Sequence, residues 1–480
     1  MGEQVGRSTA ALCATAVGLV ALGLYLATLS PGLTWAHDSA DGGELAAAAR
    51  TLGIPHPPGY PTYVLLAHLF TWLPLGEVAT RTNLFSALCA ALTAALLAWA
   101  LARTGARPSA ALAAGLALAA SPLLWSQATV TEVHALNGLF TAALLAAACV
   151  GAARCPLGVG LLWGLSLGNH LTALFCAPLA LLALGRPRRA WLWGALGLAL
   201  GLTVYLYLPL RAAADPPVNW GDPRTLERFE WMVSGGPYRG FVFALPPTHL
   251  PARLLSWAGL LTETFGWPGL LVIVLGGCGL SFSATHCPNG RGLLGATAVV
   301  LVLDSAFAIG YDTSDSYLYL LPALVCLALW LGWGTDWLLG ALTARQRWAG
   351  WAALALALVL PLIAMGVRFP ALDLSDDRTG SEFAARVLDP APLQAVILSE
   401  RDEQTFALWY FQYALDRRSD VVTVDTGLLG YDWYVAQLAR RLGVPLPVEA
   451  LQAGARQAAT ALERPVCAIL PDGELSCVEP

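Results

Sequence analysis

The stretch AALCATAVGLVALGLYLATL, residues 10–29, decides the fold class, because it holds twenty predominantly apolar residues and no charge. A transmembrane helix needs about 20 such residues, whereas the apolar region of a signal peptide has about 7 to 15. We therefore interpret this stretch as an uncleaved first membrane-spanning helix. The composition agrees, since 57% of the 480 residues are hydrophobic and 12% are charged. These values exclude an ordinary soluble globular protein.

More apolar runs follow along the chain, each long enough to cross a bilayer or nearly so. They lie at 79–101, 108–124, 135–153, 190–210, 254–280, 293–311, 317–341 and 349–367. The run 157–184 is longer than one crossing and is interrupted by Asn169-His170, which predicts two short helices that meet at a polar apex. The sequence thus predicts an all-α polytopic membrane protein with about eleven transmembrane helices.

Arginine sets the predicted orientation, because short cytoplasmic loops are enriched in basic residues. One set of loops holds Arg103, Arg107, Arg154, the cluster 186–189, Arg291, Arg345 and Arg347. The opposite set, predicted to be extracytoplasmic, comprises 30–78, 125–134, the 169–170 apex, 211–253, 312–316 and everything after Arg368. The segment 211–253 carries Arg residues of its own, together with acidic ones. The net charge of −5 argues against nucleic acid as a partner.

After Arg368 the composition changes, because charges become frequent and apolar runs shorten to strand length. Strands are predicted at 395–398, 421–424 and 466–470, with amphipathic helices at 402–415 and 432–442. We therefore divide the chain into a membrane domain, 1–367, and a small extracytoplasmic α/β domain, 368–480. In the membrane domain, 30–78 forms interfacial helices and 211–253 an external loop. No glycine-rich loop indicates nucleotide binding in the α/β domain.

Cysteine usage argues against structural zinc, since the ten cysteines include no CxxC pair. Cys467 and Cys477 flank the turn-like Pro471-Asp472-Gly473 and are able to pair if that region is exported. The sequence leaves the pairing open. It also assigns no metal ligands and no cofactor, although carboxylates near the membrane surface are compatible with a divalent cation.

The densest polar cluster lies in the first loop, where Asp41 and Glu44 stand three residues apart at the start of an alanine-rich segment. This spacing places both carboxylates on one side of a helix. The same spacing is also typical of an N-terminal capping pattern, so a purely structural role is an equal alternative. His37 and Asp38 precede this pair. His56 and Tyr60 follow in a proline-rich turn that cannot be helical.

Further polar groups fall on the same predicted side of the membrane, at helix mouths and span ends. Glu132 and His134 start one helix, Asn169 and His170 form the apex, Arg211 ends a span, and Asp312 and Asp315 lie beside tyrosines. Each has a structural alternative, namely capping, interhelical hydrogen bonds, an arginine snorkelling to the interface, or an aromatic belt. Guanidinium groups also suit phosphate oxygens, which makes Arg211 a candidate phosphate ligand.

These motifs resemble the multi-pass proteins of domain-of-unknown-function 2723, grouped as glycosyltransferase family 117, whose animal member is a protein O-mannosyltransferase. The family's Asp-Ser-Gly-Glu signature corresponds to Asp41-Gly42-Gly43-Glu44, with Gly42 in place of serine. Other matching motifs are His56-Pro57-Pro58-Gly59-Tyr60-Pro61, Glu132 to Asn137, Asn169-His170-Leu171-Thr172 and Asn219-Trp220-Gly221-Asp222-Pro223. The long repeat-rich C-terminal region of the animal protein is missing, which weakens the case for a protein acceptor.

The resemblance implies a GT-C membrane fold and a polyprenyl-phosphate-linked sugar donor, with mannose as the candidate sugar. It also implies a location in the inner cell membrane, with the active site on the extracytoplasmic side. It implies that Asp41 acts as the base toward a hydroxyl of a protein or glycan acceptor, and that the sugar is transferred with inversion. Glu44 would either tune the pKa of Asp41 or orient the acceptor. His56, His170 and Arg211 would bind the donor phosphate. Tyr60, Glu132, His134, Asn169 and Asp315 would position substrates.

Two rival functions fit the helix count. A transporter or lipid flippase would show internal repeats and binding groups at the bilayer midplane, whereas no clear repeat is present and the carboxylates lie in loops or at helix ends. A non-catalytic assembly protein would use the C-terminal domain as a binding module, and its first-loop acids would matter only for stability.

Overall fold

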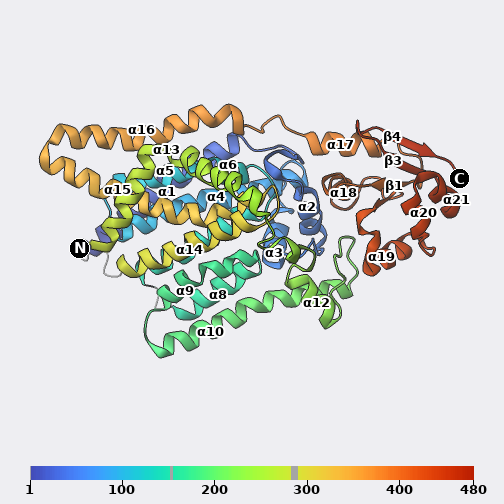
Figure 1. Cartoon of the computed structure of the whole chain (residues 1–480), viewed down its shortest axis with the longest axis horizontal. Helices are drawn as coiled ribbons and strands as arrows, with labels where there is room; N and C mark the ends of the chain where they lie inside the picture. Colours follow the sequence, from blue (N-terminus) through green and yellow to red (C-terminus); the bar gives the residue numbers. More distant parts are fainter. Residues whose placement is uncertain (1, 152–154, 283–289) are drawn as a thin grey trace.

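The computed structural model describes residues 2–151, 155–282 and 290–480; Arg154, one of the orientation-setting arginines, lies outside them. The molecule is elongated, with the N-terminus at one end and the C-terminal part at the other (Figure 1). The first sixteen helices are α1 (Gly2–Ala27), α2 (Gly42–Thr51), α3 (Pro61–Phe70), α4 (Val78–Arg103), α5 (Pro108–Ala119), α6 (Pro122–Ala128), α7 (His134–Val150), α8 (Pro156–Leu167), α9 (Ala177–Leu184), α10 (Arg188–Leu202), α11 (Tyr207–Ala213), α12 (Leu226–Val233), α13 (Leu250–Phe282), α14 (Gly290–Gly310), α15 (Leu321–Arg345) and α16 (Arg347–Leu372).

Among the described residues, seven helices are long and apolar enough to cross a membrane, or eight if the bent pair α5 and α6 forms one span. The expected number of about eleven is therefore too high by the criterion of length. The difference comes from three segments that are helical as predicted but short: α7, α8, and the segment Leu171–Leu184. The last two flank residues 168–170, which confirms the predicted pair of short helices at a polar apex.

Glycine allows α8 and α10 to pack backbone against backbone, which holds the apex in place. A Cβ atom on Gly160 would lie 1.9 Å from the Gly194 carbonyl oxygen, and one on Gly197 would lie 2.1 Å from that of Leu157. Small residues commonly permit such close approach between membrane helices. The connection at the end of α8 is thereby fixed relative to the 211–253 region that follows α10.

The C-terminal part is an α/β unit with a four-stranded sheet of order β2-β1-β3-β4, in which β1 pairs in parallel with β2 and β3, and β4 is antiparallel. The predicted strands and the helices after the first two strands are present. The sequence did not predict α17, α20, α21 or β4. The elements are α17 (Thr379–Leu388), β1 (Val396–Ser399), α18 (Asp402–Trp409), η8 (Tyr410–Ala414), β2 (Val422–Asp425), α19 (Asp432–Leu442), α20 (Val448–Ala453), α21 (Ala455–Leu462), β3 (Val466–Ile469) and β4 (Leu475–Val478).

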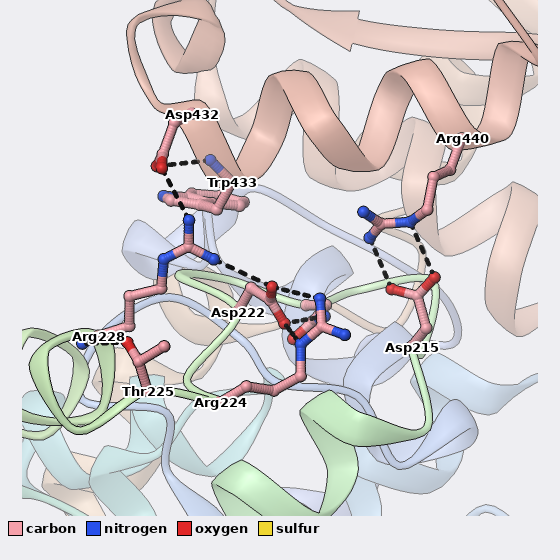
Figure 2. A network of polar contacts seen from close by, with 9 residues as sticks. Asp215, Asp222, Arg224, Thr225, Arg228, Asp432, Trp433 and Arg440 are labelled. Atoms are coloured by element: carbon pink, nitrogen blue, oxygen red, sulfur yellow. Dashed lines mark hydrogen bonds and ion pairs between the residues drawn. The ribbon is translucent and has the colours of Figure 1, made fainter.

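Ion pairs attach α19 to α12 and to the segment between α11 and α12 (Figure 2). Arg228 bridges Asp222, at 3.1 Å, and Asp432, at 2.7 Å. Arg440 pairs with Asp215 at 2.9 Å. The two contacts lie at opposite ends of α19, so the C-terminal part is held at two points along this helix. The short helices α2 and α3 lie between the membrane helices and the C-terminal part (Figure 1).

Candidate active site

Asp41 begins α2, but it does not cap it. It occupies the N-cap position, and its side chain makes no capping hydrogen bond. Glu44 is fully buried and bonds to His56, so it does not complete a capping box either. Asp41 and Glu44 therefore do not form the N-terminal capping pattern that was the alternative role for this pair. The Asp41 carboxylate remains 39% exposed, which leaves it accessible to a second molecule.

His56 is the centre of the cluster and contacts three polar groups at once. Its Nδ1 lies 2.6 Å from Glu44 Oε2, and its backbone N–H donates to the same oxygen at 3.2 Å. Its Nε2 lies 3.0 Å from the Tyr60 hydroxyl and 3.6 Å from Asp41 Oδ2. The imidazole thus sits between the two first-loop carboxylates. The rigid turn 55–60, hydrogen-bonded from the Gly59 N–H to the His56 carbonyl, holds it there.

The charges of this cluster are strongly coupled. Burial disfavours a charged imidazole, but Asp41 and Glu44 outweigh this effect and raise the pKa of His56 to about 10. His56 is therefore an imidazolium at neutral pH. Burial raises the pKa of Glu44 and of Asp41, while the imidazolium opposes the rise in both. One buried cation thus helps to keep two carboxylates ionised.

Aromatic rings and two further histidines lie next to this cluster, beyond Tyr60. The Tyr60 ring stacks on His170 at 6.3 Å between centroids, and His170 lies 5.5 Å from His134 and 5.3 Å from Tyr319. His170 also caps the 3-10 helix Leu171–Cys176 by accepting the Thr172 N–H at 3.2 Å. The structure therefore brings the two histidines from separate loops into contact with the first-loop cluster.

Several buried polar atoms beside these histidines have no hydrogen-bond partner within the part of the chain that the structure describes. They are Oε1 of Glu132, Nδ1 of His134 and Oδ1 of Asn169. The Asn169 amide itself donates to the Val133 carbonyl at 3.2 Å, which joins the two loops. Buried polar atoms normally find partners, so these three are suited to receive hydrogen bonds from a bound molecule.

Asp315 and Arg211 take different positions. Asp315 precedes the 3-10 helix η7 (Ser316–Leu320) and is close enough to Asp41 for its charge to raise the pKa of that carboxyl. Arg211 lies at the other end of α2, where its Nε and Nη2 donate to the carbonyls of Leu52 and Thr51 at 2.7 and 3.2 Å. The guanidinium is thus engaged with the C-terminal end of α2.

Four further residues of the candidate site were not predicted as site residues from the sequence. Trp220 and Tyr238 place their rings 6.2 and 5.9 Å from that of His56. Asp402, in the C-terminal part, is near enough for Asp41 and His56 to affect its pKa. Arg253 lies in the groove described below. Only Trp220 belongs to a motif that the sequence singled out. The others come from segments whose proximity no local pattern reveals.

A groove of about 500 Å³ opens between α13, α14 and η7. Its walls are largely apolar and include Trp257, Leu260 and Leu320. At one point the Arg253 guanidinium enters it, held by Ser316 and by the Thr313 carbonyl at 2.8 Å. Tyr317 lines the groove and donates a hydrogen bond to Asp38 of the first loop. The lining also includes Glu263, so the groove holds one acidic and one basic residue. Its apolar walls suit an acyl chain, and the Arg253 guanidinium suits an anionic head group.

Metal binding finds little support. Across residues 2–151, 155–282 and 290–480, no group of three or more histidine, cysteine or acidic side chains is arranged to hold a metal ion.

Comparison with known proteins gives matches along both parts of the chain. Residues 41–193 match the family described as Protein O-mannosyl-transferase TMEM260 N-terminal domain, and residues 380–457 match TMEM260-associated domain 2. In structure, the chain is similar to ArnT from Cupriavidus metallidurans bound to undecaprenyl phosphate, with a TM-score of 0.61 at 15% identity, over 96% of this chain and 93% of that one. The chain has the GT-C fold of ArnT and is similar to TMEM260. The apo state of the same ArnT gives a TM-score of 0.50 at 15% identity, over 88% and 90% of the two chains.

Among curated proteins, this GT-C chain is 28% identical over 471 residues to Protein O-mannosyl-transferase TMEM260 of Mus musculus, with 85% of this chain covered. It is 21% identical over 464 residues, with 82% covered, to the Dictyostelium discoideum protein of the same description. The match spans 62% and 55% of the length of these two relatives. The predicted GT-C fold is confirmed.

Proposed function

We propose that this chain is a membrane glycosyltransferase that moves a sugar, with mannose as the candidate, from a polyprenyl-phosphate donor to an acceptor hydroxyl with inversion. The observation that carries the proposal is the half-exposed Asp41 carboxylate beside an imidazolium that is itself anchored by buried Glu44. A base for a hydroxyl must be ionised and accessible. The Asp41 side chain is open to a second molecule, and the charge of His56 opposes the rise in the Asp41 pKa that burial causes.

In the proposed reaction, the acceptor oxygen forms a bond to the anomeric carbon while the bond from that carbon to the phosphate oxygen breaks. The electron pair leaves with the lipid phosphate, and Asp41 takes the acceptor proton. Glu44 keeps His56 charged and oriented through the 2.6 Å contact. The unpartnered atoms of Glu132, His134 and Asn169 are suited to hold sugar hydroxyls.

The donor lipid would occupy the groove between α13 and α14, which is lined by apolar residues. Arg253 would contact the phosphate, since a guanidinium suits phosphate oxygens and this one is fixed within the groove. His56 and His170, which the sequence predicted as ligands of the donor phosphate, lie in the cluster around Asp41. Support comes from the fold similarity to an ArnT that was crystallised with undecaprenyl phosphate.

We also propose that the site and the C-terminal part face the extracytoplasmic side of the inner cell membrane. Cys467 and Cys477 form a disulfide between β3 and β4, and disulfides persist in oxidising compartments. The arginine-rich loops between the spans favour the same orientation. The protein or glycan that accepts the sugar would then be an exported molecule.

The decisive experiment incubates purified protein in nanodiscs with radiolabelled polyprenyl-phosphate mannose, and with glucose and N-acetylglucosamine analogues, and measures sugar release. Asp41→Asn is expected to lower turnover by about 10²- to 10⁴-fold, while a Glu449→Gln control, at an exposed acid of α20, keeps wild-type turnover. Turnover by a folded Asp41→Asn protein at the wild-type rate would remove the proposed base. Movement of intact lipid between leaflets without sugar release would favour a flippase.

A further inference from the structure

Helix α18 of the C-terminal part docks directly on the first turn of α2, next to the proposed base. A Cβ atom on Gly43 would lie 2.4 Å from the Phe406 carbonyl oxygen, so the two helices touch backbone to backbone at this point. The Phe406 ring lies 6.5 Å from that of Trp220, which in turn lies 6.2 Å from His56. Figure 1 shows α18 beside α2 at the junction of the two parts. The C-terminal part therefore lies against the first turn of α2, next to Asp41.

Asp402 lies on the same face of α18 as Phe406, because residues four apart in a helix are neighbours on its surface. It is the first residue of α18, one turn before the docking contact, and it is exposed. Desolvation, together with the charges of Asp425 and Asp41, raises the pKa of Asp402 to about 6. Tyr238, whose ring faces His56, is also close enough to Asp402 for the charge of that carboxylate to raise the pKa of the phenol.

Buried hydrogen bonds to the ends of two strands hold α18 in position. Thr405 donates to Asp425 Oδ2 at 2.7 Å and lies 3.0 Å from the Ser399 hydroxyl, and all three side chains are buried. Ser399 and Asp425 end the parallel strands β1 and β2. In open α/β sheets, ligands bind at the carboxyl ends of the strands. This edge of the sheet, with Asp402 in front of it, faces the membrane part.

From this arrangement we propose that Asp402 is an acceptor-binding residue, which the docking of α18 on α2 brings near Asp41. The inference rests on the proposed function and assigns the acceptor side of that site. The carboxylate of Asp402 accepts a hydrogen bond from an N–H or O–H group of the acceptor next to the attacking hydroxyl. Donor binding uses other groups, on α13, α7 and the 169–170 apex. Asp402 therefore governs transfer to the acceptor more than loss of the sugar to water.

Glu403 provides a matched control, because it is also an acid in the first turn of α18 and pairs with the neighbouring Arg401. Both acids favour the helix dipole equally. A merely structural role would therefore give Asp402→Asn and Glu403→Gln the same effect. The assay supplies labelled polyprenyl-phosphate mannose with two acceptor probes, a threonine-centred dodecapeptide mixture and p-nitrophenyl α-mannoside. It measures transfer and sugar release to water in the same sample.

We expect Asp402→Asn to lower the ratio of transfer to release at least tenfold and to raise the KM for the accepted probe, with partial rescue by Asp402→Glu. Glu403→Gln should do neither. Equal behaviour of the two variants, or an unchanged ratio, would overturn the inference alone. No sugar release by wild-type protein would overturn the proposed function and the inference with it.

Discussion

The Glu44 carboxylate and the His56 imidazole form a buried pair in which one carboxylate oxygen, Oε2, meets both the ring Nδ1 at 2.6 Å and the backbone N–H at 3.2 Å. The second carboxylate oxygen of Glu44 has no partner among the described residues. Glu44 therefore holds both the ring and the backbone of His56 through a single oxygen atom.

Glu44→Gln should destabilise the protein by about 3 kcal/mol, because a buried imidazolium would lose the anion that compensates it. Thermal unfolding in detergent measures the loss. His56→Gln should show a similar loss, and the double variant should lose less than the sum of the two, since both partners are then neutral. Additive losses would mean that the two groups do not form a coupled pair.

Stability should fall as pH rises from neutral to alkaline values. The pKa of His56 is raised from its ordinary 6.5 to about 10. The folded protein therefore holds a proton that the unfolded chain has lost, and this stabilisation is complete below about 6.5 and disappears as pH passes about 10. Unfolding temperatures recorded from pH 6 to pH 10 should decline more steeply for wild type than for His56→Gln. Parallel curves would show that His56 is neutral in the folded state.

Gly43→Ala should weaken the docking of the C-terminal part. The new methyl group would meet the Phe406 carbonyl oxygen at 2.4 Å, and the helices must separate. Overpacking of this kind costs about 1–3 kcal/mol. Gly430→Ala is a suitable control, since a Cβ atom there meets nothing within 4 Å. Limited proteolysis of the segment 373–378 reports the docking, and equal cleavage rates in both variants would contradict the close contact.

The sequence reveals the local half of this site. Asp41, Glu44, His56 and Tyr60 lie within twenty residues of each other, so a helix start and a rigid turn suffice to bring them together, and the family motifs mark the same residues. The apex at Asn169-His170 was visible because polar residues interrupt an apolar run. Strand-length apolar runs after Arg368 likewise indicated the α/β part.

The other half of the site depends on contacts across more than a hundred residues. Tyr238 packs near His56, and Asp402 comes close enough for His56 to affect its pKa, although neither segment shows a periodic signal. The need for glycine at position 43 appears only when the Phe406 carbonyl is in place. The predicted number of spans exceeds the number of helices that meet the length criterion. Composition reveals that a segment is apolar but not where its helix ends, and α7 and α8 are too short to meet that criterion. For Arg211, the end of a span fits both a phosphate ligand and a structural arginine, so only its hydrogen-bond partners distinguish the two.

The ion pairs within the 215–228 segment and those that join this segment to α19 should contribute unequally. Asp222 is 8% exposed and bonds to both Arg224 and Arg228, whereas Asp215 and Arg440 are each almost half exposed. Asp222→Asn should cost about 1–3 kcal/mol, and Arg440→Gln about 0.2–1 kcal/mol. Urea titration followed by tryptophan fluorescence compares the two. A larger loss for Arg440→Gln would reverse the assigned order.

Arg211→Lys separates the two roles open to this residue. In the structure the guanidinium holds the carbonyls of Thr51 and Leu52, so a lysine, which lacks the planar fork, should lower the unfolding temperature and turnover together through a shift of α2. The loss expected from two weakened hydrogen bonds is about 1–3 kcal/mol. Arg50→Lys is the matched control, because Arg50 lies in the last turn of α2, near the Arg211 contacts, but its guanidinium covers the Trp72 ring. A rise in the KM for the lipid donor at unchanged stability would instead identify Arg211 as a phosphate ligand, as its position at the end of a span first suggested.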